Sequence, residues 1–138
     1  MKVSTKGRYG LRALVDLACN SDDNHVSLVQ IAERQNLSLN YLEQVFSTLR
    51  KAGIIHSLKG AQGGYCLAKP PVEISVGEVL RALEGEFLIV DSERGPGEDP
   101  VKRALHMLVW NRINTEVQDY MYSRSLQDLV EEYLKLNV

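Results

Sequence analysis

The residues best suited to recognition chemistry lie between positions 38 and 48. Polar side chains that follow Ser38 recur there at spacings that would place them on one outward face of a helix: Asn40, Tyr41, Glu43, Gln44, Ser47 and Thr48. In the DNA major groove, Asn and Gln pair with adenine, and Glu accepts a hydrogen bond from cytosine. This pattern indicates contact with DNA bases, and an ordinary helix with a solvated polar face is the alternative.

The charged residues are divided unevenly between the two halves of the chain. Residues 1–69 hold nine Lys or Arg and five Asp or Glu, whereas residues 70–138 hold seven and thirteen. Binding to DNA requires local positive charge rather than a basic chain as a whole, and the net charge here is only −2. The uneven division therefore favours a DNA-binding role for the first half of the chain.

A first helix is expected to begin at Thr5, with Ser4 or Thr5 as its N-cap. Leucine and other apolar residues from position 11 to position 18 recur at helical spacing and would form its buried face. The opening turn carries Thr5, Lys6 and Arg8, and its unpaired amide groups favour an anion. We therefore expect these three residues, and Arg12 one turn later, to contact DNA phosphates.

Two further helices, joined by a short turn, would position the polar face. Their apolar residues recur at helical spacing: Leu28, Ile31 and Ala32 in the first, and Leu39, Leu42, Val45, Phe46 and Leu49 in the second. Asn36 suits the turn because Asn tolerates left-handed backbone angles, and Ser38 stands where an N-cap is expected. This layout is typical of a helix-turn-helix, whose second helix enters the major groove.

A β-hairpin is predicted directly after these helices. Apolar runs at 54–58 and 65–68 flank a glycine-rich loop, which is typical of two strands with a long tip. A hairpin in this position is a wing, and we expect Lys59, Gly60 and Gln62 at its tip to approach DNA. A phosphate-binding P-loop is excluded because the glycines are not followed by the GK[ST] element.

A long helix is predicted over about 101–122, opened by Pro100. It has two apolar stripes, more than one small domain can cover, so we expect a second copy of the chain to cover the remainder. The residues expected at this dimer interface are Leu105, Trp110, Ile113, Val117 and Tyr120. Ser75 is expected to cap a helix over 76–83, and Ser123 or Ser125 to cap a last helix over about 125–136. A short apolar run at 87–90 is expected to pack against the core.

Together these elements predict a mainly α fold with a small β-wing. A winged helix-turn-helix domain would occupy residues 1–84, and an effector-loop and dimerisation region would occupy residues 85–138, with its loop at 91–100. The chain has no apolar run of the length that a membrane span requires and no signal segment, which favours a cytoplasmic protein. No Ser/His/Asp arrangement or metal-ligand spacing is present, so an enzyme is not expected.

Four stretches resemble the Rrf-two (Rrf2) family of bacterial winged-helix regulators: residues 6–10, 37–44, 49–53 and 59–65. The resemblance covers essentially the whole chain. It implies a homodimer held by the long helix, with two winged helix-turn-helix heads on double-stranded DNA. It also implies that Ser38, Asn40, Tyr41, Glu43 and Gln44 face the groove and that residues 59–63 form the wing tip.

The chain departs from part of this family in the loop before the long helix. Members that hold a 2Fe–2S cluster carry three cysteines there, and thiolates are the usual cluster ligands. Similar positions here hold Ser92, Glu98 and Ala104, and the two cysteines of the chain are Cys19 and Cys66. We therefore expect no cluster, no other cofactor and no metal site in this chain.

The departure leaves more than one interpretation of function. Residues 98–103 and 125–130 resemble the cysteine-metabolism repressor of the family, which works with a cysteine-biosynthesis enzyme as partner. This resemblance implies a dimeric repressor of cysteine, sulfur or iron–sulfur genes acting at a palindromic operator. The alternatives are an apo-like iron–sulfur regulator whose ligands are replaced, and a protein-interaction module that uses the winged helix.

Overall fold

The computed structural model describes residues 2–21, 25–59, 63–90 and 99–137 of the chain. The elements are α1 (Thr5–Asn20), α2 (Leu28–Gln35), α3 (Leu39–Lys51), β1 (Ile55–Leu58), β2 (Gly64–Leu67), the 3-10 helix η1 (Pro71–Glu73), α4 (Val76–Glu84), α5 (Pro100–Leu105), the π-helical turn η2 (His106–Trp110), α6 (Asn111–Ser123) and α7 (Leu126–Leu136). Helices dominate, and β1 and β2 form a small antiparallel sheet. This arrangement confirms the expected fold class.

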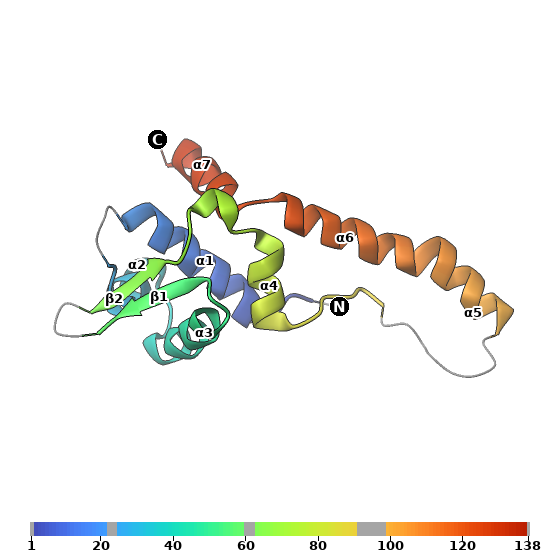
Figure 1. Ribbon diagram of the computed structural model, residues 1–138, viewed down its shortest axis with the longest axis horizontal. Helices are drawn as coiled ribbons and strands as arrows, with labels where there is room; N and C mark the ends of the chain where they lie inside the picture. Colours follow the sequence, from blue (N-terminus) through green and yellow to red (C-terminus); the bar gives the residue numbers. More distant parts are fainter. Residues whose placement is uncertain (1, 22–24, 60–62, 91–98, 138) are drawn as a thin grey trace.

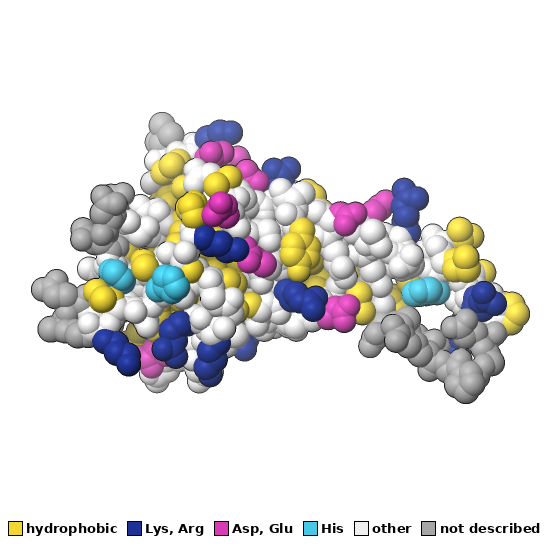
Figure 2. Space-filling view, viewed as in Figure 1, with side chains coloured by type: hydrophobic (Ala, Val, Ile, Leu, Met, Phe, Trp, Pro, Cys, Tyr) yellow, Lys and Arg dark blue, Asp and Glu magenta, His cyan; other side chains and the backbone are white. Residues whose placement is uncertain are grey.

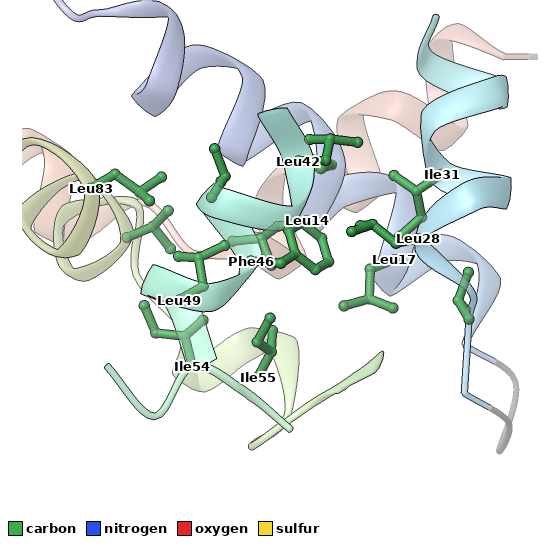
Figure 3. Packing of buried hydrophobic residues seen from close by; sticks show 14 of the residues in the cluster. Leu14, Leu17, Leu28, Ile31, Leu42, Phe46, Leu49, Ile54, Ile55 and Leu83 are labelled. Carbon is green, nitrogen blue, oxygen red and sulfur yellow. The ribbon is translucent and has the colours of Figure 1, made fainter. Parts of the chain in front are cut away.

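The head is the part of the structure from α1 to the end of α4 at Glu84. Its first three helices meet around a common apolar core (Figure 3). Leu14 and Leu17 of α1 lie against Ile31 of α2 and Phe46 of α3, and all four side chains are fully buried. Burying a side chain of this kind contributes about 1.5–3 kcal/mol to folding. The apolar stripe of α3 therefore sets the orientation of the helix and leaves its polar face outward.

The wing is fastened to the head at its base. β1 and β2 pair with Ile55 opposite Leu67 and Leu58 opposite Gly64. Ile55 is buried, and the three residues that follow it in β1 are exposed, so only the base of the wing enters the core. Val26, just before α2, exchanges two backbone hydrogen bonds with Tyr65, at 2.9 and 2.8 Å between nitrogen and oxygen. The backbone bonds of Val26 and the burial of Ile55 therefore fix the orientation of the wing relative to the core.

Helix α4 packs closely on both α1 and α6, and glycines make the close approach possible. A Cβ atom at Gly10 would collide with Leu83 of α4. A Cβ atom at Gly77 would lie 2.5 Å from the ring of Tyr122 in α6. Side chains at these two positions would push the helices apart. Helix α4 is therefore the physical link between α1 and the long helix.

Helices α5, η2 and α6 form one continuous helical run that projects away from the head (Figure 1). The backbone keeps right-handed helical angles at His106 and Asn111, where the segments join. The run spans positions 100–123, and the sequence predicted about 101–122. In the part of the chain that the structure describes, no helix has both the length and the apolar character needed to cross a membrane.

Residues 87–90 lie along α6. Asn114 is the buried polar residue of α6, and its Oδ1 accepts from the amides of Ile89 at 2.7 Å and Val90 at 3.3 Å. Its Nδ2 donates back to the Val90 carbonyl at 2.9 Å, and Gln118 donates to the Phe87 carbonyl at 3.0 Å. The sequence predicted that this apolar run packs on the core. The structure instead holds it by polar contacts to the long helix.

The chain then returns to the head through α7. Ser75 and Ser125 form a short antiparallel bridge, with the Leu126 amide donating to the Ile74 carbonyl at 2.7 Å. Both serines also cap the helices that follow them, each through a reciprocal pair of bonds with the acid three residues later. The cap of the last helix is therefore Ser125 rather than Ser123.

Candidate nucleic-acid interface

Helix α3 presents an exposed polar face at the edge of the head. Asn40, Glu43 and Gln44 are exposed, whereas Leu42, Val45, Phe46 and Leu49 on the other side of the helix are fully buried. Ser47 and Thr48 are half-buried, and the Thr48 hydroxyl donates to the Gln44 carbonyl at 3.2 Å. An amide or carboxylate on such a helix can reach a base edge because the backbone beneath it is fixed by the core.

The turn before α3 has the local chemistry that the sequence predicted. Asn36 adopts the left-handed conformation, with φ of 54°, and the Leu37 amide donates to the Ala32 carbonyl at 2.9 Å. The Ser38 hydroxyl accepts from the Tyr41 amide at 3.3 Å, as an N-cap does. These contacts set the angle at which α3 leaves α2. Ser38 itself is exposed at the start of the helix.

An ion pair with a buried carboxylate fixes α2 against α1. The carboxylate of Asp16 is 2% exposed and lies 2.7 Å from the Arg34 guanidinium, and Gln35 donates to the same carboxylate at 2.9 Å. The hydrogen bond that Arg34 donates to Asp16 raises the pKa of Arg34 and so stabilises its protonated form. Arg12 donates to the Gln35 carbonyl at 2.8 Å and so closes the end of α2. This contact gives Arg12 a role in supporting the helix-turn-helix that the sequence did not predict, and its expected phosphate contact stays a prediction.

Helix α1 is joined to α3 on the exposed side of the core. The Tyr41 hydroxyl and the Thr5 hydroxyl lie 3.1 Å apart in a hydrogen bond, and the Tyr41 ring meets the edge of the Tyr9 ring at a centroid distance of 6.0 Å. The Arg8 guanidinium lies 5.8 Å from the Tyr9 ring centroid and is exposed. The first turn of α1 therefore lies beside the polar face of α3, with Lys6 half-buried in that turn.

The sequence-based expectation for the N-terminus of α1 is wrong in one respect. Ser4 stands at the N-cap position, but its hydroxyl does not accept from the helix and instead donates to Glu84 Oε1. The same oxygen accepts from the Ser4 amide at 2.9 Å and from the Gly7 amide at 3.0 Å. The carboxylate of Glu84 therefore occupies the N-terminal end of α1, where the sequence predicted that an anion from another molecule would bind.

Basic side chains gather around α3 and the wing. In the view of Figure 2, Lys and Arg lie along the lower edge of the head, over α3 and the adjoining hairpin. Arg50 and Lys51, in the last turn of α3, and Lys59, directly after β1, are exposed. Arg50 and Lys51 were not among the DNA contacts expected from the sequence, although they directly follow the polar face. Gly60 and Gln62, expected at the wing tip, lie outside the described residues.

The residues expected at the dimer interface lie along the projecting helix. Leu105, Ile113 and Tyr120 are 43%, 36% and 61% exposed, and Trp110 and Val117 are half-buried. Val101, Met107 and Leu108 add exposed apolar surface near the far end of the same helix. Figure 2 shows hydrophobic side chains at that end. An isolated helix with this much apolar surface is typical of a subunit interface.

The two cysteines lie on different elements of the head. Cys19 is half-buried in α1, and Cys66 is half-buried in β2. Burial, with a smaller contribution from the charge of Asp16, raises the pKa of the Cys19 thiol. A higher pKa disfavours the thiolate, which is the form that reacts and binds metals. Of the positions similar to cluster ligands, Ala104 is in α5, and Ser92 and Glu98 lie outside the described residues.

The sequence is similar along almost its whole length to known regulators. Residues 3–132 match the Rrf2 family, described as iron-dependent transcriptional regulators. The HTH-type transcriptional regulator CymR of Bacillus subtilis strain 168 is 43% identical over 129 residues, which cover 94% of this chain and 89% of CymR. The HTH-type transcriptional regulator IscR of Pectobacterium atrosepticum is 38% identical over 141 residues, which cover 100% of this chain and 84% of IscR.

Solved structures show the same relationship. The structure of CymR (YrzC), described as the global cysteine regulator of B. subtilis, matches with a TM-score of 0.82 and 42% identity, covering 96% of this chain and 98% of CymR. T. potens IscR matches with a TM-score of 0.81 and 39% identity, covering 100% of this chain and 92% of that chain. These relatives are regulators rather than enzymes. The chain therefore belongs to the Rrf2 family and is a DNA-binding transcriptional regulator.

Proposed function

We propose that the chain is a homodimeric repressor that recognises a palindromic operator through α3 and works without an iron–sulfur cluster. The observation that carries the proposal is the exposed set of Asn40, Glu43 and Gln44 on a helix whose opposite face is fully buried. Tyr41 and the Ser38 cap complete the groove-facing set of α3. The first turn of α1, with Thr5, Lys6 and Arg8, lies beside it to contact the phosphates.

The proposed palindromic operator follows from a two-fold symmetric dimer. The projecting helix exposes Leu105, Ile113 and Tyr120, and a second copy is the occupant that covers this surface. A symmetric dimer presents two α3 helices related by the same axis, so its operator has two inverted half-sites separated by whole helical turns. The two wings, each with a Lys59, would flank these half-sites as point-charge contacts to the backbone.

Replacing Gln44 with Ala is expected to remove about 1–3 kcal/mol of discrimination at one base pair of each half-site. The loss concerns preference rather than general affinity, because Gln44 offers a donor and an acceptor to one base edge and no charge to the phosphates. Fluorescence anisotropy on an operator duplex and its single-base variants measures the change. The operator is obtained by selecting bound duplexes from a random pool.

Gln30→Ala is the matched control, since Gln30 is an exposed glutamine of α2 that lies before the turn. This variant should keep the full base preference. An equal loss of affinity by Gln44→Ala for the operator and for random DNA would show that Gln44 does not face the bases.

The proposal of a cluster-free regulator rests on the donor set. A 2Fe–2S cluster is held by several thiolates close together, or by thiolates with histidine. This chain has two cysteines, and they lie in α1 and β2 of the head, away from α5, which begins at Pro100. The residues present do not fit the cluster that cysteine-bearing members hold. Regulation must then act through another signal.

Anaerobic incubation with iron and sulfide tests this directly. We expect no visible absorbance, less than stoichiometric iron after desalting, and an operator affinity equal to that of the untreated protein. A parallel sample of a cysteine-bearing relative shows that the reconstitution works. Stoichiometric iron with an altered operator affinity would return the chain to the iron–sulfur branch.

We infer the regulated genes from the similarity of the chain to CymR. The CymR relative is described as a global cysteine regulator, and residues 98–103 and 125–130 here resemble the cysteine-metabolism repressor of the family. We therefore infer control of cysteine or sulfur genes, with a cysteine-biosynthesis enzyme as a protein partner. Footprinting on the host genome, with and without that enzyme, would identify the genes and show whether the partner changes occupancy.

A further inference from the structure

Glu84 lies at the C-terminal end of α4, whereas the helix dipole favours a carboxylate at the N-terminal end. A negative charge at the C-terminal end of a helix is disfavoured by the helix dipole, and Glu84 is the last residue of α4. The contacts of Glu84 explain its position, because Oε1 accepts from the Ser4 amide, the Ser4 hydroxyl and the Gly7 amide at the start of α1. Glu84 therefore caps a helix that begins 79 positions earlier in the chain.

Gly7 is shaped to this contact. A Cβ atom at position 7 would lie 2.5 Å from Glu84 Oε1 and 3.0 Å from Leu80. Only a residue without a side chain lets the carboxylate approach the amides of the first turn. The glycine of the first helix and the acid at the end of α4 therefore form one unit, which holds α1 against α4.

The same turn of α1 carries the residues assigned to the phosphates. Thr5 bonds to Tyr41 of α3, and Lys6 and Arg8 flank Gly7. Without the Glu84 contact, the amides of Ser4 and Gly7 would need solvent as partner and the turn would fray. A frayed turn would move Lys6 and Arg8 relative to α3 while leaving α3 on its core.

We propose that Glu84 is a positioning residue for DNA binding: its carboxylate holds the first turn of α1 so that Lys6 and Arg8 meet the backbone of the duplex that α3 contacts. This inference rests on the proposed function. It gives a negatively charged residue a favourable role near a polyanion. The rival role is electrostatic, in which Glu84 repels phosphates and limits affinity. The two roles predict opposite effects for the same substitutions.

The test uses the full-length protein and a duplex selected from a random pool, with anisotropy measured at several salt concentrations. Glu84→Ala should weaken binding, and the slope of log K against log salt should fall by about 0.9 for each phosphate that the protein no longer neutralises. Glu84→Gln should retain most of the affinity, because its amide oxygen accepts the same bonds. Gly7→Ala should behave like Glu84→Ala although the negative charge is kept, since the new methyl group displaces the carboxylate.

Glu86→Ala is the matched control, because Glu86 is an exposed acid two residues beyond Glu84. Its removal changes the net charge equally and should leave the salt slope as it is. A double-mutant cycle excludes a general loss of stability: Lys6→Ala should cost much less affinity in the Glu84→Ala background than in the wild type. A lower unfolding temperature alone would not produce this non-additivity.

Several outcomes would overturn the inference. Tighter binding by both Glu84→Ala and Glu84→Gln would establish repulsion instead. Glu84→Ala with the affinity and slope of Glu86→Ala, or additive effects of Lys6→Ala and Glu84→Ala, would show that Glu84 does not position the turn. If Gln44→Ala loses base preference while Glu84→Ala changes nothing, only the role of Glu84 fails. If Glu84→Ala flattens the slope while Gln44→Ala keeps its preference, only the assignment of α3 to the groove fails.

Discussion

Replacing Ile113 with Asp is expected to split the dimer and weaken operator binding by roughly 100-fold or more, because linked heads gain that much from effective concentration. Ile113 is 36% exposed in the single chain and lies on a helix that projects beyond the head (Figure 1). A charge there costs little in the single chain, since water can reach it. In a dimer the same carboxylate would be buried in an apolar interface opposite its own copy.

Thr115→Asp is the matched control. Thr115 is exposed two residues later, on a different side of α6, so it carries the same new charge without entering the apolar stripe. Sedimentation velocity at micromolar concentration should show a monomer for Ile113→Asp and a dimer for Thr115→Asp and the wild type. A wild-type protein that sediments as a monomer, both free and on DNA, would contradict the assignment of this helix to dimerisation.

Replacing Phe46 with Ala is expected to lower the free energy of unfolding by about 3–5 kcal/mol, the usual cost of removing a buried aromatic side chain. Phe46 is fully buried in α3 (Figure 3), and its ring meets the Tyr65 ring edge-on at a centroid distance of 5.0 Å. The substitution therefore leaves a cavity beneath α3 and removes the Phe46 ring that contacts Tyr65 of β2 in the wing. Operator binding should weaken as temperature rises, because α3 and the wing lose their common support.

Urea unfolding followed by circular dichroism measures this loss. Protein concentration is held constant across variants, because the stability of a dimer depends on it. Val29→Ala is the control, since Val29 is 49% exposed on α2 and its truncation should cost less than about 0.5 kcal/mol. A loss below about 1 kcal/mol for Phe46→Ala would mean that α3 does not pack through this face.

The individual elements of the head could be predicted from local sequence because their signals act over a few residues. Asn36 takes the left-handed turn, and Ser38 accepts the Tyr41 amide three positions later. The apolar spacing of α3 placed Leu42, Val45 and Leu49 on its buried side. Capping, turn preference and helical periodicity depend on neighbours within one or two turns, so the chain itself contains the information.

Contacts between distant segments could not be predicted in this way. Glu84 meets the start of α1 across 80 positions, and Asp16 meets Arg34 across 18. Each is a charged residue in an unfavourable local place: an acid at the C-terminal end of α4, and an acid on the buried side of α1. Such exceptions to a local pattern were the available signal, but they identify no partner, because the partner depends on how the helices pack.

For the candidate site, the sequence determined which residue types face outward on α3, and the tertiary structure decided what surrounds them. The polar set of Asn40, Glu43 and Gln44 follows from the apolar stripe alone. Only the packed structure brings Thr5 to Tyr41, brings Arg12 to the Gln35 carbonyl at the end of α2, and directs the Gly7 amide of α1 to the Glu84 carboxylate. The physical reason is that the apolar spacing within a helix determines which of its sides is buried, whereas side-chain volumes and glycine contacts determine how closely two helices pack.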